Sequence, residues 1–146
     1  MNKIPAIIHG GFHKDERGTL SFFNDFDLLP VRRFYVIEHP DVRVVRAWQA
    51  HKIEQKWFYV IAGSFKVVIV KPEEWLGSSE KLNPQEFILK SGDNRLLHIP
   101  GGFANGFKAL APGSQLMVFS DFPISKAGSD DFRFDKSLWY DWTTQS

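Results

Sequence analysis

Nine short runs of β-branched, aromatic and aliphatic residues follow one another along the chain, and turn-forming residues separate them. Helical periodicity is almost absent. Short strands at regular spacing are typical of a β-sandwich or a β-barrel. We therefore expect an all-β fold with strands at residues 19–23, 33–37, 42–48, 56–62, 65–70, 86–90, 95–99, 104–110 and 115–119.

Glycine, proline and asparagine mark the turns between these runs. Gly63-Ser64 has the composition of a hairpin turn, and Ser91-Gly-Asp-Asn94 and Pro112-Gly113 are two further turns. Residues 72–84 form the longest interruption and are expected to be a mobile loop. The aromatic tail Leu138-Trp-Tyr-Asp-Trp142 is expected to fold back onto the barrel or onto a partner, because an exposed cluster of this kind is unusual.

The length of 146 residues fits a single domain, 1–146, with a barrel at about 15–122 and a tail at 123–146. Fourteen Phe, five Trp and three Tyr suit a β-rich core or a stacking pocket. The net charge of +1 gives no sign of nucleic-acid or membrane binding. The absence of cysteine excludes disulfides and thiolate catalysis, and no apolar run has the length of a signal peptide or a membrane span. We expect a cytoplasmic protein.

Two motifs stand out among the runs: Arg46-Ala-Trp-Gln-Ala-His-Lys52 and Ile99-Pro-Gly-Gly-Phe-Ala-Asn-Gly-Phe107. Together with Asp15-Glu-Arg-Gly18, Arg33-Phe-Tyr-Val-Ile37 and the segment from Lys56 to Gly63, they cover most of the chain. In order and spacing they resemble the cupin-fold enzymes that act on nucleotide-linked 4-keto-6-deoxy sugars. The resemblance implies a double-stranded β-helix, that is, a jelly-roll barrel.

This family has two branches, the dTDP-4-dehydrorhamnose 3,5-epimerases and the dTDP-sugar 3,4-ketoisomerases. The segment 99–107 is similar to the epimerase motif, which has His at position 105, whereas 46–51 resembles the ketoisomerase motif, which has His at 49 and 51. The chain also ends early compared with the epimerases. The resemblance therefore implies that it lacks the C-terminal region whose aspartate supports their base, and the length favours the ketoisomerase branch.

A metal site is not expected. Where metal-binding cupins carry His-x-His, Glu and a further His, this chain has Gln49, His51, Gln55 and Asn105. Transition metals prefer imidazole nitrogen or carboxylate oxygen, and neutral amides are weak substitutes. We expect no cofactor.

Proton transfer next to a carbonyl needs a base with a pKa near the working pH and a group that stabilises the enolate. In the enzymes that the chain resembles, the base is the His at position 49, and Gln49 cannot take up a proton. His51 lies on the same strand face as Gln49 and is the candidate base, because alternate residues of a strand point to one side. The resemblance makes Lys56 a candidate for stabilising the enolate. It also makes Tyr35 a candidate proton donor, since Met117 replaces the epimerase tyrosine.

The resemblance also implies substrate contacts. Arg46 matches an arginine near the nucleotide phosphates, and a planar guanidinium suits a pair of phosphate oxygens. The remaining candidate binding residues are Gln49, Arg17, Asn105 and His98.

Each of these residues also has a purely structural interpretation. His51 suits a polar strand end, Arg46 and Lys56 suit solvated strand charges, and Tyr35 suits core packing. His98 alternates with Leu97 and Ile99, so it faces either away from the core or into a pocket wall.

Three functions are consistent with the pattern. The first is a sugar-nucleotide epimerase or ketoisomerase acting on a dTDP-linked 4-keto-6-deoxyhexose. The second is a nucleotide-sugar-binding module that lost its base when Gln replaced His at position 49. The third, a metal-dependent cupin, is disfavoured by the missing ligands. A homodimer is expected, because barrels of this type protect their edges by pairing sheets or exchanging N-terminal strands, and because the aromatic tail needs burial.

Overall fold

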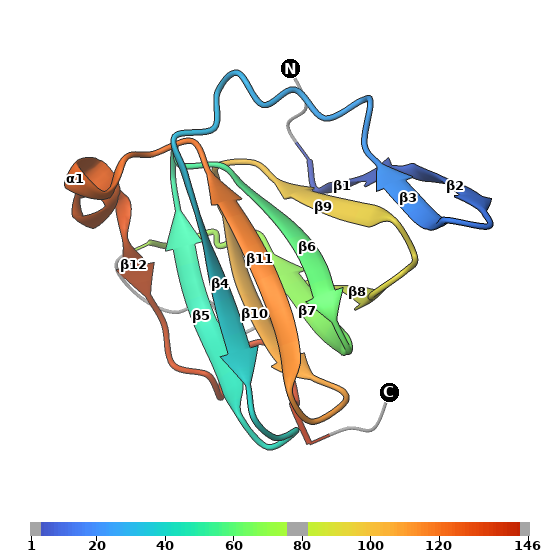
Figure 1. Ribbon diagram of the computed structural model, residues 1–146. Helices are drawn as coiled ribbons and strands as arrows, with labels where there is room; N and C mark the ends of the chain where they lie inside the picture. The colour runs from blue at the N-terminus through green and yellow to red at the C-terminus, as the bar shows by residue number, and fades with distance from the viewer. Residues whose placement is uncertain (1–3, 76–81, 144–146) are drawn as a thin grey trace.

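A computed structural model describes residues 4–75 and 82–143. The chain forms a jelly-roll barrel of two five-stranded antiparallel sheets, with a separate two-stranded hairpin (Figure 1). The first sheet has the order β1-β9-β6-β11-β4 and the second has the order β12-β5-β10-β7-β8. The strands are β1 (Ala6–His9), β2 (Gly11–Asp15), β3 (Gly18–Phe22), β4 (Arg33–His39), β5 (Val45–His51), β6 (Lys56–Ala62), β7 (Ser64–Val70), β8 (Gln85–Lys90), β9 (Arg95–Ile99), β10 (Phe103–Ala109), β11 (Ser114–Ser120) and β12 (Phe132–Arg133).

The nine strands expected from the sequence are confirmed as β3 to β11. Their boundaries lie within three residues of the expected ones. Three further strands, β1, β2 and β12, were not predicted. Of the expected loop at 72–84, residues 76–81 lie outside the described residues.

The hydrophobic core lies between the two sheets and is built by alternation along the strands. Phe58 and Val60 of β6 and Leu116 and Val118 of β11 point inward from the first sheet, where they meet side chains such as Phe107 of the second sheet. Because successive strand residues face opposite sides, Lys56 and Tyr35 also point into the barrel. The alternation that builds the core therefore also brings polar groups inside.

Strand β5 contains a bulge that changes which residues point inward. In its pairing with β10, Asn105 lies opposite Gln49 but Phe107 lies opposite Arg46, so one residue of β10 spans two of β5. Arg46 and Gln49 therefore reach the same cavity although they are three positions apart. The two-residue alternation alone would have placed them on opposite faces.

The turns that the sequence predicted have the backbone that their residues allow. Gly63, Gly92 and Gly113 have φ angles of 72°, 87° and 74°, and Asn94 has φ 52°. These are left-handed conformations in which glycine and asparagine are tolerated best.

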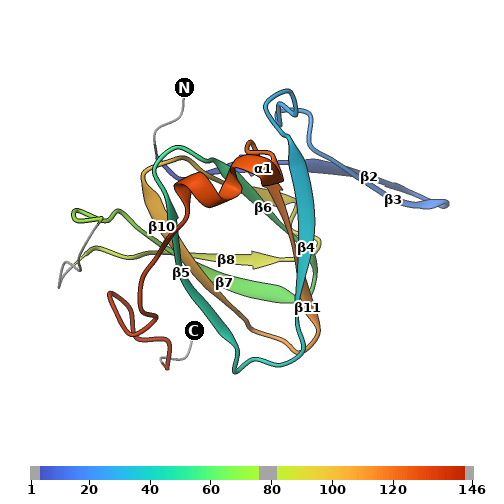
Figure 2. The ribbon, with the colours of Figure 1, turned by 90° about the vertical axis from the view of Figure 1, so that its left-hand side faces the viewer.

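The C-terminal tail packs on the outer face of the second sheet (Figure 2). Trp48 of β5 lies 5.4 Å from Trp139 and 5.6 Å from Trp142, measured between ring centroids. The Trp48 indole nitrogen also donates a hydrogen bond to the Leu138 carbonyl at 2.9 Å. The expected return of the aromatic tail onto the barrel is thus confirmed.

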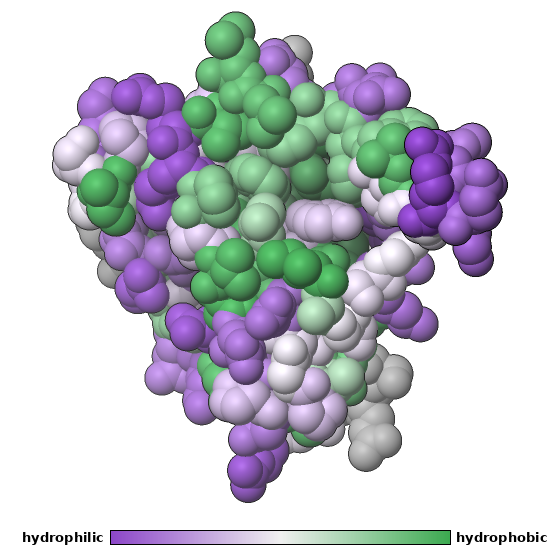
Figure 3. Space-filling model, in the orientation of Figure 1, coloured by the Kyte–Doolittle hydropathy of each residue, from purple (hydrophilic) through white to green (hydrophobic). Residues whose placement is uncertain are grey.

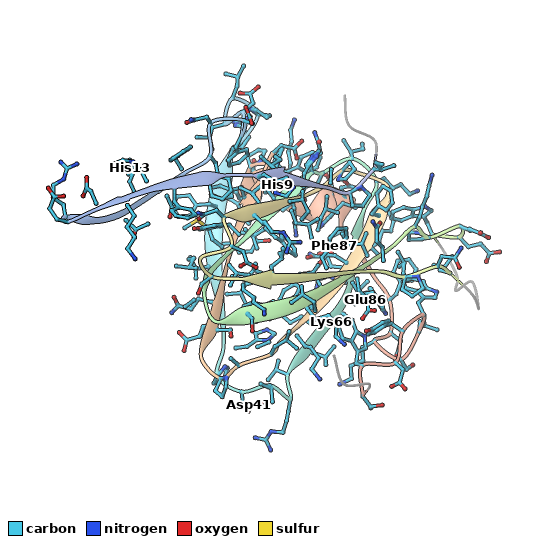
Figure 4. All side chains as sticks on the ribbon, turned by 90° about the vertical axis from the view of Figure 1, so that its right-hand side faces the viewer. His9, His13, Asp41, Lys66, Glu86 and Phe87 are labelled. Atoms are coloured by element: carbon cyan, nitrogen blue, oxygen red, sulfur yellow. The ribbon has the colours of Figure 1, made fainter. Side chains whose placement is uncertain are left out.

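A buried lysine lies under the same tail. Lys66 of β7 is 1% exposed, and its Nζ lies 3.8 Å from Glu86 Oε1 on the neighbouring strand β8 (Figure 4). Lys66 also lies under the ring of Tyr140, whose hydroxyl donates a hydrogen bond to Glu86. This group links the tail to the far edge of the second sheet.

The hairpin of β2 and β3 extends away from the barrel, and His13, labelled in Figure 4, lies far out on it. The helical segments are short: α1 spans Ile124–Ala127 and the 3₁₀ turn spans Gly128–Asp130. Across 4–75 and 82–143, no helix has the length and apolar character needed to cross a membrane.

Replacing Gly106 with alanine tests the packing of the tail against the bulge. A Cβ at Gly106 would lie 2.7 Å from Trp142 Cζ2 and 2.8 Å from the Ala47 Cβ. Overpacking of a close-packed site costs roughly 1–3 kcal/mol. We expect Gly106→Ala to lower the free energy of unfolding in urea by that amount. Gly128→Ala is the matched control, because no heavy atom lies within 4 Å of its added Cβ; equal effects of the two substitutions would contradict this packing.

Candidate functional site

A cavity of about 370 Å³ opens in the barrel between β4 and β5. In Figure 2, β5 lies to the left and β4 to the right, on opposite sides of the barrel. The wall combines apolar side chains with polar and charged ones. Its lining residues are Tyr35, Ile37, Val45, Arg46, Ala47, Trp48, Gln49, Lys56, Phe58, Asn105, Phe107, Val118, Arg133 and Phe134.

Gln49 lies at the centre of a polar chain in this cavity. Its Oε1 accepts a hydrogen bond from Lys56 Nζ at 2.9 Å, and its Nε2 donates to Asp131 Oδ1 at 3.3 Å. Asp131 also accepts two hydrogen bonds from Arg133, at 2.7 Å and 3.1 Å. The amide is thus held between an amine on β6 and a carboxylate from the tail.

Lys56 is buried, with 4% of the residue exposed. Burial lowers the pKa of its amine to about 8. The charged ammonium form loses more hydration energy on burial than the neutral amine does, so burial favours the neutral form. Glu54 opposes this shift and Arg33 adds to it. The neutral amine is therefore accessible close to physiological pH.

Tyr35 of β4 faces the cavity and lies near two cations. Its ring centroid is 5.1 Å from the Arg33 guanidinium carbon and 5.9 Å from Lys56 Nζ. Burial raises the pKa of the phenol above its usual value, so Tyr35 keeps its proton at neutral pH. It can therefore serve as a hydrogen-bond or proton donor.

Arg46 is held by one side of its guanidinium group. Its Nε donates to His39 Nε2 at 3.2 Å. Burial, together with the charge of Arg46, lowers the pKa of His39 and keeps its imidazole neutral, as an acceptor must be. This bond orients Arg46 at the cavity wall.

His51 does not line the cavity. Its Nδ1 lies 2.6 Å from the Asp130 backbone carbonyl, which can only accept, so Nδ1 carries the hydrogen in the neutral ring. Its Nε2 is buried and has no hydrogen-bond partner among the described residues. Burial, and after it the charge of Lys56, lowers the His51 pKa. The catalytic role of His51 stays a prediction.

The loop that follows His51 is fixed by the buried carboxylate of Asp130. It accepts backbone hydrogen bonds from Lys52, Ile53 and Glu54 at 2.7–2.8 Å. Hydrogen bonds to a charged acceptor contribute more than neutral ones. This contact ties the tail to the segment between β5 and β6.

Tyr35, Arg46, Gln49, Lys56 and Asn105 are brought together by the fold. Two other predicted site residues lie elsewhere. His98 stacks on Trp57 at 4.9 Å and donates to Gln55, on the side of the sheet opposite to the core residues Leu97 and Ile99. In the neutral ring, the hydrogen lies on Nε2, which donates it to Gln55 Oε1.

Arg17 lies on the projecting hairpin. Its guanidinium is ion-paired with Asp15 at 2.7 Å, and the side chain is 83% exposed. Within a single chain, neither Arg17 nor His98 contributes to the cavity.

The sequence did not reveal Asp131, Arg133 and Phe134. The resemblance implied that the chain lacks an aspartate behind position 49, yet Asp131 is bonded to Gln49. The pairing of Arg133 with Gln49 in the short strand β12 brings this segment to the cavity. The alternating Asp131-Phe-Arg-Phe134 pattern was the available signal, but it is too short to identify a strand.

In the described part of the chain, no group of three or more His, Cys, Asp or Glu side chains is arranged to hold a metal ion.

The sequence profile of the family described as "FdtA: WxcM-like, C-terminal" matches residues 1–135. No curated protein sequence matches the chain significantly.

Solved structures share the fold. A dTDP-4-dehydrorhamnose 3,5-epimerase from Bacillus anthracis, with TDP and pyrophosphate bound, is 23% identical with a TM-score of 0.75, over 97% of this chain and 86% of that one. A dTDP sugar isomerase from Desulfovibrio desulfuricans is 20% identical with a TM-score of 0.78, over 99% and 94%. A mutant of a Thermoanaerobacterium thermosaccharolyticum 3,4-ketoisomerase, in complex with TDP-4-keto-6-deoxyglucose, is 20% identical with a TM-score of 0.71, over 92% and 90%.

The depressed pKa of Lys56 predicts a pH-dependent effect of Lys56→Met on stability. Between pH 8 and 10.5 the unfolded chain binds more protons at Lys56 than the folded chain does. The wild-type protein therefore gains stability relative to Lys56→Met as pH rises through this window, by about 3 kcal/mol in total. Urea unfolding of both proteins at the two ends of the window measures this.

Lys90→Met, at an exposed position of β8, is the control and is expected to show no such dependence. A stability difference between wild type and Lys56→Met that stays constant with pH would contradict the shift.

Proposed function

The chain belongs to the family described as "FdtA: WxcM-like, C-terminal", and we propose that it is a sugar-nucleotide isomerase or epimerase. Its substrate would be a dTDP-linked 4-keto-6-deoxyhexose, and the reaction would move a proton next to the carbonyl. The observation that carries this proposal is the convergence of an amine, a phenol and an arginine on one cavity, from Lys56, Tyr35 and Arg46.

The charge of the cavity favours an anionic ligand. Arg46, Lys56 and Arg133 line it, and its lining within the described residues includes no carboxylate. Asp131, the acid that bonds Gln49, is already engaged by Arg133. The positive charge of the two arginines suits the diphosphate of a nucleotide sugar, and the planar fork of an arginine matches a pair of phosphate oxygens.

The same cavity supports the chemistry. Removal of a proton next to a carbonyl places negative charge on the carbonyl oxygen. The protonated phenol of Tyr35 and the nearby cations can stabilise that oxygen, and the tyrosine can return a proton to carbon. Phe107 and Phe134 supply apolar walls that limit access of water to the reacting carbon.

Gln49 favours a second function, a binding module without turnover. An amide at the position where the resembling enzymes carry an imidazole cannot accept a proton. Such a module would bind the nucleotide sugar through Arg46 and leave it unchanged. Carbon–hydrogen exchange separates the two functions, because a module that only binds exchanges nothing.

The test combines binding with exchange. Calorimetry with dTDP is expected to show binding, and incubation with dTDP-4-keto-6-deoxyglucose in deuterium oxide is expected to show deuterium at a carbon next to the carbonyl by NMR. Arg46→Met is expected to weaken dTDP binding by about 10- to 100-fold, the usual effect of losing hydrogen bonds to a charged group.

Arg43→Met, at an exposed position with its own Asp41 partner, is the matched control and should bind dTDP as the wild type does. Binding without exchange would identify the module, and no binding to any nucleotide would exclude both functions.

We further propose that the protein is a homodimer that pairs through the outer face of the first sheet. Phe34 and Val36 of β4 are 63% and 47% exposed there, and Ile61 of β6 is 40% exposed. Figure 3 shows apolar side chains gathered on this face. A second copy of the chain would cover them by a two-fold contact, the commonest way for a sheet face to be buried in an oligomer.

Light scattering coupled to size-exclusion chromatography tests the dimer. The wild type is expected to have twice the mass of one chain, and the Phe34→Lys/Val36→Lys variant is expected to have the mass of one. Ile124→Lys, on the exposed helix α1, is the control and should stay dimeric. A monomeric wild type would contradict the proposed pairing.

A further inference from the structure

The polar chain from Asp131 to Lys56 has a fixed direction. A carboxylate only accepts hydrogen bonds, so the side of the Gln49 amide that faces Asp131 must be its NH₂ group. This turns the amide oxygen toward Lys56, where it accepts from Nζ at 2.9 Å. Arg133 fixes Asp131 in turn, with two hydrogen bonds to the carboxylate.

The partner of Lys56 is therefore a neutral oxygen. A carboxylate in its place would hold the amine as an ammonium ion, because an opposite charge at this distance favours the charged form. The amide oxygen orients the amine and leaves the neutral form accessible. Burial acts in the same direction, since Lys56 is 4% exposed.

The competing base does not line the cavity. The Nδ1–H of His51 is engaged by the Asp130 carbonyl, which leaves Nε2 as the proton acceptor, but the ring is not among the residues of the cavity wall. Gln49, two residues before His51 on β5, cannot take up a proton. Among the described lining residues, Lys56 is the group that can be neutral, accept a proton and reach a ligand in the cavity.

We infer that Lys56 is the base that removes the carbon-bound proton in this pocket, and that Gln49 is the residue that positions its amine. This inference rests on the proposed function. The lone pair of Nζ takes the proton from the carbon next to the carbonyl. The electrons of that C–H bond form the enolate double bond, and the carbonyl oxygen takes the negative charge. The resulting ammonium then returns the proton to the former carbonyl carbon, while the hydroxyl proton of the neighbouring carbon moves to the former carbonyl oxygen. The carbonyl is thereby shifted by one carbon, and the reaction is a net isomerisation.

The first experiment needs no substrate. The lysine side chains of the full-length protein are labelled with ¹³C at Cε and titrated by NMR, and Lys56→Met identifies the signal of Lys56. One lysine is expected to titrate at about 8 and to be missing from the variant. Titration of Lys56 at the ordinary value for lysine would overturn the assignment, because the amine would then be almost fully protonated at neutral pH.

The second experiment measures deuterium exchange of dTDP-4-keto-6-deoxyglucose as a function of pH. The wild-type rate is expected to rise with a midpoint near that of Lys56. Lys56→Met is expected to lower it by at least about 100-fold, a usual contribution of general base catalysis. Calorimetry is expected to show that Lys56→Met still binds dTDP through Arg46 and Arg133, so that the loss of exchange reports the chemistry and not a lost pocket. Lys90→Met is the control, because Lys90 is exposed on β8 and is not among the residues that line the cavity.

The outcomes separate the inference from the proposed function. No exchange by the wild-type protein would overturn the proposed function itself. Exchange that Lys56→Met retains and His51→Asn abolishes would make His51 the base, which overturns only the assignment of Lys56.

The positioning role of Gln49 has its own test. In the double variant Gln49→Glu/Asp131→Asn, the new asparagine can donate to the new carboxylate, and that carboxylate replaces the neutral partner of Lys56. The midpoint of the exchange profile is expected to rise by about one to three pH units, the usual effect of an adjacent opposite charge. Loss of stability alone would not move this midpoint. An unchanged midpoint would overturn the role of Gln49.

Discussion

The buried carboxylate of Asp130 holds the C-terminal tail to the barrel, and the candidate site depends on this attachment. Three backbone N–H groups of residues 52–54 point at it, and the backbone carbonyl of the same residue accepts from His51. Buried backbone donors need partners, and one carboxylate satisfies three of them here. The next residues of the tail are thereby brought alongside β5, where Asp131 and Arg133 reach the cavity.

The cavity that results is positively charged and has a neutral amide near its centre. Arg46 and Arg133 stay charged at any ordinary pH, whereas burial makes the charge of Lys56 sensitive to pH near 8. Gln49 bonds both the amine and the acid without adding charge. Because the amide neither carries a charge nor takes up a proton, Lys56 has a neutral partner, and its protonation is left to burial and to the surrounding charges.

The two faces of the first sheet serve different purposes. Its inner face contributes Tyr35, Lys56 and Phe58 to the cavity. Its outer face carries the stacked pair His98 and Trp57, together with exposed apolar residues of β4 and β6. Alternation along each strand separates these two sets, so the cavity residues and the outer residues come from the same strands but face opposite sides.

The sequence by itself determined the strands β3 to β11 and the turns at Gly63, Asn94 and Gly113, because the residue pattern of a strand and the residues of a left-handed turn are local properties. Alternation would have separated Arg46 from Gln49, and only the bulge opposite Gly106, a feature of strand pairing, brings both into the cavity. The tertiary structure also decided that His51 bonds the Asp130 carbonyl and does not line the cavity, and that Arg133 and the Gln49-bonded Asp131 join the site. Those placements depend on contacts between residues about 80 positions apart, such as Gln49 with Asp131, and no local pattern specifies contacts at that separation.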